Sequence, residues 1–230
     1  MHSEQHIFMV RTRVWDLPTR LFHWALVACI VGLAVTGTVG GNAMVWHFRF
    51  GYCVATLLLF RIVWGFVGGH WSRFSAFTYA PASVVAYVRG KRQPEHSVGH
   101  SPLGSVSVFA MLAVLAAQLA TGLVSDDEIA FSGPLTRFVS NATATLATNY
   151  HAHVGKWLLL ALVVLHVIAI AVYQHRKHKL LGAMIHGDKD LSVRSPASRD
   201  DARARLVALA VLAACAAGVY WITTLAATGF

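Results

Sequence analysis

Five uninterrupted apolar stretches dominate the sequence and decide what it can fold into. Each is long enough to cross roughly 30 Å of hydrocarbon as a helix, which takes about 20 residues. Only 13% of the residues are charged, whereas soluble domains carry about 25%. The chain is therefore predicted to be an all-α membrane protein with a four-helix transmembrane bundle and a fifth, C-terminal transmembrane helix. The spans are expected near residues 17–39, 44–67, 104–124, 150–173 and 206–226.

The spans divide the chain into two parts. Residues 1–189 hold the first four spans and are expected to form a core, and residues 190–230 are expected to form a polar linker and the extra helix. Asp16 is a favourable N-cap for the first span, and Pro18 suits its first turn. The aromatic-rich segment 74–88 is too short to span, so it is expected to lie on the membrane surface.

The placement of charge predicts the orientation. Lys and Arg gather before the first span, between the second and third spans, and between the fourth and fifth spans, whereas the third loop is acidic at residues 126–128. By the positive-inside rule, the N-terminus lies in the cytoplasm and the C-terminus in the periplasm of a bacterial inner membrane. The net charge of +9 therefore reflects topology, and no nucleic-acid partner is expected.

Histidines at membrane depth are the main candidates for function. Ionisable residues inside a bilayer are costly and usually mark a functional site. The topology places two of them in the cytoplasmic half and the others near the outer surface. Paired imidazoles at two levels are what two six-coordinate haems need. The inner pair is His23 with His166, and the outer pair is His47 with His151 or His153.

Helical geometry favours one of the two outer candidates on the fourth span. At about 100° per residue, His151 lies about 60° around the helix from His166, and His153 lies about 140° around it. His151 is therefore the better predicted ligand, with His153 as the alternative at a helix start. A rise of 1.5 Å per residue separates the two levels by roughly 20 Å, which suits electron tunnelling.

Other residues fit a haem-binding membrane core. Cys29, Cys53 and Cys215 lie in apolar runs and form no paired-thiol motif followed by His, so any haem is expected to be bound non-covalently. Arg61 lies inside the second span, where a haem propionate is a natural partner for its guanidinium, and snorkelling to the interface is the alternative. Arg20 is a weaker candidate for the same role.

His100, at the inner surface, is a candidate for lining a quinone or propionate site. Glycines within the spans allow close approach of helices or of a macrocycle, although ordinary helix packing explains most of them.

Three sequence segments carry a resemblance to a known family. Residues 14–24 read VWDLPTRLFHW, residues 61–68 read RIVWGFVG, and residues 99–104 read GHSPLG. With these motifs the chain resembles the bacterial cytochrome b561 and nickel–iron hydrogenase b-type cytochrome family over about residues 10–189.

The resemblance implies a four-helix core, two b haems and quinone as one electron partner. It implies haem ligation by His23, His47 and His166. The family separates its two fourth-span histidines by 14 residues, which lands on Ala152 here, so the resemblance does not choose between His151 and His153.

These observations predict a function in transmembrane electron transfer. We expect a dihaem b-type cytochrome that passes electrons between a periplasmic or membrane redox partner and the quinone pool, either as a carrier or as the membrane subunit of an oxidoreductase, with oligomers possible. The rival hypothesis is a histidine-based metal or proton transporter. The spans contain no Asp or Glu, which disfavours the rival because proton and cation paths normally use carboxylates.

Overall fold

The computed structural model describes residues 9–176 and 179–227. The five predicted spans form long helices that are apolar enough to cross a membrane, so the predicted all-α membrane class is confirmed. The long helices are α1 (Leu17–Val39), α2 (Met44–Val67), α4 (Pro102–Val124), α6 (Lys156–His175) and α8 (Ala202–Ala227). The shorter helices are α3 (Pro81–Val88), α5 (Asn141–Asn149) and α7 (Leu180–His186).

The fourth span is longer than the sequence predicts. The helix begins at Asn141 instead of near residue 150, and α5 runs into α6 through η6, a π-helical turn over Tyr150–Gly155. Single π-turns inside α-helices are rare and often occur at functional sites. The connections hold 3-10 turns at η1 (Gly41–Ala43), η2 (His70–Ser72), η3 (Phe74–Ala76), η4 (Pro94–Ser97) and η5 (Thr136–Phe138).

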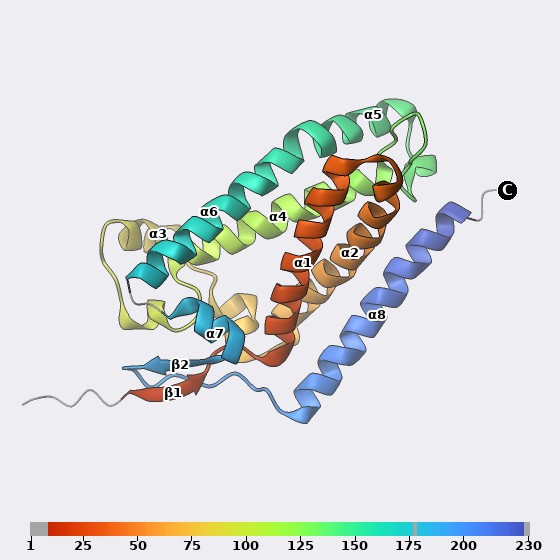
Figure 1. The fold of residues 1–230 in the computed structure, drawn as a ribbon. Coiled ribbons are helices and arrows are strands. Elements are labelled where there is room, and N and C mark those ends of the chain that lie inside the picture. Colours follow the sequence, from red (N-terminus) through yellow and green to blue (C-terminus); the bar gives the residue numbers. More distant parts are fainter. Residues whose placement is uncertain (1–8, 177–178, 228–230) are drawn as a thin grey trace, which may run out of the picture.

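A small antiparallel sheet, which the sequence analysis did not predict, closes one end of the bundle. It pairs β1 (Val10–Arg13) with β2 (Asp188–Leu191), two segments at opposite ends of the core sequence. We call this end the sheet end. The opposite end, which carries η1 and the loop 125–140, is called the far end (Figure 1).

The fifth helix belongs to the same packed body as the core. Figure 1 shows α8 running beside α2, and the two helices are in contact along their length. Ala208 of α8 packs in one buried cluster with Phe22, Phe60 and Trp64. A second cluster, made by Val54, Leu58 and Leu115, joins α2 to α4. The helix expected as an extra element thus covers one side of α1 and α2.

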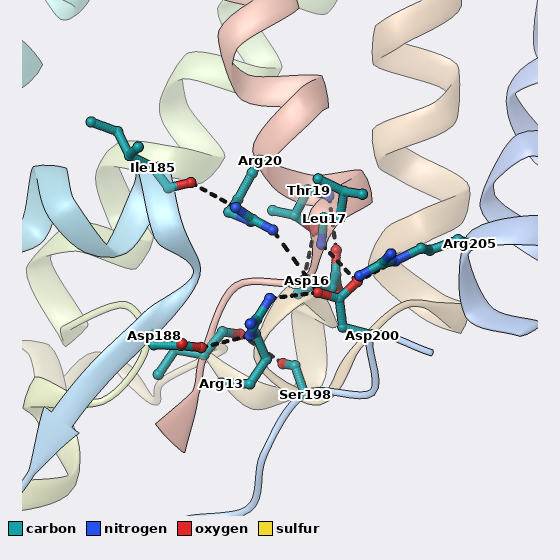
Figure 2. Close-up of polar contacts among 12 residues, drawn as sticks. Arg13, Asp16, Leu17, Thr19, Arg20, Ile185, Asp188, Ser198, Asp200 and Arg205 are labelled. Atoms are coloured by element: carbon teal, nitrogen blue, oxygen red, sulfur yellow. Dashed lines mark hydrogen bonds and ion pairs between the residues drawn. The ribbon is translucent and has the colours of Figure 1, made fainter. Parts of the chain in front are cut away.

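The segment expected as a polar linker also attaches α8 to the start of α1. The carboxylate of Asp200 accepts hydrogen bonds from Arg13 at 2.7 Å, from Arg205 at 3.1 Å and from the backbone amide of Leu17 at 3.1 Å (Figure 2). The Asp200 side chain is only 7% exposed. Ser198 adds a hydroxyl hydrogen bond to the carbonyl of Val14 at 2.7 Å.

Candidate functional site

Two of the predicted histidines face each other at the far end of the bundle. His47, in the first turn of α2, and His151, in η6, have ring centroids 6.2 Å apart and ring planes at 82°. Two imidazoles that share one metal ion need a centroid separation of about 6 Å, because each contributes a metal bond of about 2 Å and a ring radius of about 1.1 Å for bonds of about 1.33 Å. The observed centroid separation therefore fits two imidazoles that would bind one metal ion between them.

The hydrogen bonds of this far-end pair define which ring nitrogens are free. Nδ1 of His47 donates to the carbonyl of Leu33 at 3.1 Å, and Nδ1 of His151 donates to the carbonyl of Gln118 at 2.8 Å. A carbonyl accepts only, so the proton of each neutral imidazole is placed on Nδ1. Within the described part of the chain no group hydrogen-bonds to Nε2 of either ring. Each Nε2 thus keeps a lone pair available for a metal, and the Nδ1 bond fixes the ring as in known metal sites.

The π-turn separates the two neighbouring histidines of the fourth span. His151 is half-buried against α4, whereas His153, two residues later in the same turn, is exposed. The structure therefore brings His151, and not His153, to the ring of His47. The amide of Gln118 supports this turn, because its Nε2 donates to the backbone carbonyl of His151 at 2.9 Å.

The predicted second pair, His23 and His166, lies nearer the sheet end, and we call it the sheet-end pair. His23 in α1 and His166 in α6 are both half-buried and lie close enough to interact electrostatically. The Nδ1 atom of His23 is shielded from solvent and has no hydrogen-bond partner in the described structure. Buried polar atoms without partners are rare in proteins, so this nitrogen indicates a place where a further group belongs.

Arg61 does not snorkel to the interface. It is 4% exposed, its guanidinium stacks over the ring of Phe74 at 4.8 Å, and its Nη1 has no partner among the described residues. A buried cation with an unsatisfied donor suits an anionic group such as a carboxylate. Arg61 and His166 both lie close enough to His100 to interact with it electrostatically, so the pair and Arg61 are candidates for holding an acidic cofactor with a central metal.

His100 completes this region as a neutral imidazole. Its ring packs between Phe77, at a centroid distance of 4.4 Å, and Trp15, at 4.8 Å, and its Nδ1 is buried without a partner. Burial, together with the positive charges of Arg61 and Lys189, lowers the pKa of His100 to about 3. A neutral imidazole at physiological pH serves as a hydrogen-bond donor or acceptor, and not as a counter-ion.

Arg20 is already engaged by the protein. Its Nη1 donates to the carbonyl of Ile185 at 2.6 Å, and its Nη2 lies 3.9 Å from the carboxylate of Asp200 (Figure 2). Only its Nε is buried without a partner. The structure thus places Arg20 mainly in the attachment of α1 to α7 and to the start of α8.

The residues that hold the far-end pair in place were not predicted from the sequence. The acceptors are the backbone carbonyls of Leu33 and Gln118, which no side-chain pattern reveals. Gln118 was the one polar side chain with a signal, because an amide within an apolar span needs partners.

Comparison with known proteins agrees with this architecture. The model of the family described as prokaryotic cytochrome b561 matches residues 14–187. A probable Ni/Fe-hydrogenase B-type cytochrome subunit of Azotobacter vinelandii is 29% identical over 211 residues, covering 76% of this chain and 86% of the relative. Its counterpart in Rhizobium leguminosarum bv. viciae is 26% identical, with coverages of 82% and 92%. A probable Ni/Fe-hydrogenase 1 B-type cytochrome subunit of Escherichia coli K12 is 26% identical, with coverages of 67% and 80%. The family match takes in four of the five spanning helices and all the histidines of both pairs, and the chain belongs to the prokaryotic cytochrome b561 family.

Proposed function

We propose that the chain is a dihaem b-type cytochrome that carries electrons across the membrane. The observation that carries the proposal is the far-end pair, in which His47 and His151 face each other at metal-sharing distance with both Nδ1 atoms held by carbonyls. In this proposal His47 and His151 hold one haem, and His23 and His166 hold the other. Arg61 neutralises an acidic side chain of the sheet-end haem, with His100 beside it.

The protein's own part in this function is to hold and orient. A haem iron with two histidine ligands gains and loses single electrons without changing its ligands. The Nδ1 hydrogen bonds of the far-end pair keep both Nε2 atoms directed for ligation. His151 and His166 are 15 residues apart on one helical stretch, a rise of roughly 20 Å. The two sites therefore divide the width of the bilayer between them.

A bare metal ion is less well supported than haem. The described residues contain no group of three or more His, Cys, Asp or Glu side chains that could hold an ion. Structural zinc sites use four ligands, and catalytic zinc sites use three, whereas two opposed histidines are the ligand set of a six-coordinate haem. The metal-transport form of the rival hypothesis therefore gains no support from the described residues.

The partners follow from the relatives and from the charges. The relatives are named as cytochrome subunits of Ni/Fe-hydrogenases, so we propose a hydrogenase-like redox protein as one partner and membrane quinone as the other. The basic loops at the sheet end favour a cytoplasmic location for that end of the bundle. We therefore propose that the far end lies in the periplasm. On this orientation the protein partner docks near the far-end pair, and quinone reacts near His100.

Haem analysis of the purified protein tests the proposal. We expect a reduced-minus-oxidised b-type spectrum and two haems per chain in a pyridine haemochrome assay, both extractable by acidic acetone. His151→Ala should lose one haem, and His153→Ala, its matched control two residues away, should keep both. A colourless protein, or equal loss in the two variants, would overturn the proposal or its ligand assignment respectively.

Orientation has a separate test. An impermeant maleimide applied to intact cells should label Ser132→Cys, in the exposed far-end loop, but should label Arg89→Cys, in the basic loop, only after lysis. The opposite pattern would reverse the proposed sides.

A further inference from the structure

We infer that Gly37 and Gly122 are positioning residues that seat the two imidazoles of the far-end pair; this inference rests on the proposed haem function. The two histidines are held in the same way by two different helices. In each case the ring lies over a glycine and donates to the backbone carbonyl of the residue four positions earlier. That carbonyl belongs to Leu33 in α1 and to Gln118 in α4.

The space at the two glycines is taken by the imidazoles. A Cβ atom at Gly37 would lie 3.0 Å from Cε1 and 3.1 Å from Nδ1 of His47. A Cβ atom at Gly122 would lie 2.8 Å from Cε1 and 3.1 Å from Nδ1 of His151. The separation of 2.8 Å at Gly122 is shorter than a Cβ atom tolerates, and those at Gly37 are tight, so a Cβ atom would displace the ring of His151 and shift that of His47 by a few tenths of an ångström.

The missing side chain also explains how a helix carbonyl becomes available. The carbonyl four residues before a given position already accepts that position's backbone amide, and the Cβ atoms around it limit access from the side. A glycine opens this side, so the imidazole Nδ1 reaches the carbonyl as a second donor. Carbonyl oxygens have two lone pairs and accept two donors. Each glycine together with its carbonyl therefore forms a seat that fixes both ring position and tautomer.

One seat is reinforced by a side chain. The backbone carbonyl of Gln118 accepts a hydrogen bond from Nδ1 of His151. The side-chain amide of the same residue donates to the backbone carbonyl of His151 at 2.9 Å. This second bond satisfies a carbonyl within η6. Gln118 thus holds both the ring and the main chain of one histidine.

The seats have an electronic consequence. A hydrogen bond from Nδ1 to a carbonyl raises the basicity of the coordinating Nε2 and so favours the ferric state. Displacing the ring by one methyl group weakens that bond. We expect the midpoint potential of the far-end haem to rise in Gly37→Ala and in Gly122→Ala by about 59 mV, which corresponds to a tenfold change for a one-electron couple.

The experiment compares four glycine variants of the full-length holoprotein by redox titration and electron paramagnetic resonance. The far-end component is identified as the one lost in His47→Ala. Gly218→Ala, in α8, is the space control, because no atom outside the local backbone of its own helix lies within 4 Å of its Cβ position. Gly32→Ala is the packing control, because its Cβ would strike the ring of Phe50 at 2.6 Å in the same α1–α2 contact without touching a histidine. Both controls should keep the wild-type potential and g-values, even if Gly32→Ala lowers thermal stability.

The possible outcomes separate this inference from the proposed function. A shifted far-end component in the two seat variants, with an unchanged sheet-end component, supports the seats. If Gly122→Ala does not accumulate, Gly37→Ala decides alone, because its Cβ contacts are milder. Two haems with seat variants identical to Gly218→Ala would overturn the inference and leave the proposed function intact. A wild-type protein without haem would overturn both.

Discussion

Trp64 donates its indole N–H to both carboxylate oxygens of Asp16, at 3.2 and 3.4 Å, and so joins the last turn of α2 to the N-cap of α1. Asp16 is fully buried and also accepts the backbone amide of Thr19 at 2.8 Å and that of Gly69 at 3.1 Å. The hydroxyl of Ser72 adds a bond of 2.7 Å. One carboxylate thus fixes how two spans and the loop after them meet.

Asp16→Asn should therefore destabilise the protein strongly. The amide nitrogen of Asn is a donor, so one edge of the new side chain would face backbone or indole N–H groups that now donate to the carboxylate. Leaving buried donors unsatisfied costs about 1–3 kcal/mol each, and we expect a loss of about 3 kcal/mol in the free energy of unfolding. Denaturant titration in detergent, followed by tryptophan fluorescence, measures this loss. Asp190→Asn, at the exposed position of strand β2, is the control and should change stability by less than about 0.5 kcal/mol.

Asp200 should stabilise the attachment of α8 in a pH-dependent way. Burial acts to raise the pKa of Asp200, but hydrogen bonds from Arg205 and Leu17 and the charges of Arg205 and Arg13 bring the pKa below its ordinary value of 3.8. Because the pKa is lowered in the folded state, the stabilisation is complete above the unfolded value and is lost as the pH falls through the folded one.

We expect Asp200→Asn to cost about 1–2 kcal/mol near neutral pH, since the Arg partners are partly exposed and screened. The gap between the wild type and the variant should stay constant from pH 7 to pH 5 and shrink below about pH 3.8. Unfolding midpoints measured across this range give the comparison. A gap that widens as the pH falls would show that the ionised carboxylate is not what holds the segment.

Hydropathy and local capping predicted most of the fold. The first two spans begin and end where the sequence predicted, because bilayer length and the Asp16–Pro18 start are local signals. The sheet was missed because β1 and β2 are far apart in sequence and only four residues long each. The packing of α8 against α1 and α2 could not be predicted from the sequence either. Its buried residues include Ala204 and Ala208, and alanines in an apolar run look the same whether they face lipid or protein.

One part of the geometry of the far-end pair was predictable from the sequence, and another part was not. Ideal helix geometry favours His151 over His153, and the structure brings the ring of His151 to His47. The physical reason differs from ideal α-helix geometry, because the chain forms the π-turn η6 at this position. No residue propensity marks a π-turn, so the sequence could not reveal it. That His151 is a haem ligand stays a prediction.

Arg61 should set the potential of the sheet-end haem. A buried positive charge disfavours the ferric state, so its removal should lower the midpoint potential. In Arg61→Gln we expect a fall of about 59 mV or more, a tenfold change for one electron, with the far-end haem unchanged. Arg61→Lys keeps the charge and should shift the potential less. Potentiometric titration decides this, and equal shifts of both haems in Arg61→Gln would contradict the placement.

The four histidines should sort into two pairs by which haem they affect. His23→Ala and His166→Ala should remove the same spectral component, and His47→Ala should remove the other, because the first two lie nearer the sheet end. Low-temperature spectra combined with redox titration distinguish the components. The pairing would be wrong if the His23 and His47 variants lost the same one.

Removing one residue tests the role of the π-turn η6. A π-turn closes through i→i+5 hydrogen bonds and so accommodates one residue more than an α-turn. His151 and His166 are 15 residues apart, whereas the resemblance implies a spacing of 14. Deleting Val154, which is 53% exposed, should convert η6 to an α-turn and keep His151 facing His47. Deleting Ala161, in the regular part of α6, should instead rotate the two histidine levels by about 100° relative to each other.

We therefore expect two haems in the Val154 deletion and loss of at least one in the Ala161 deletion, as counted by pyridine haemochrome. Equal haem loss in the two deletions would show that η6 is needed for the site in its own right and does not merely absorb an additional residue.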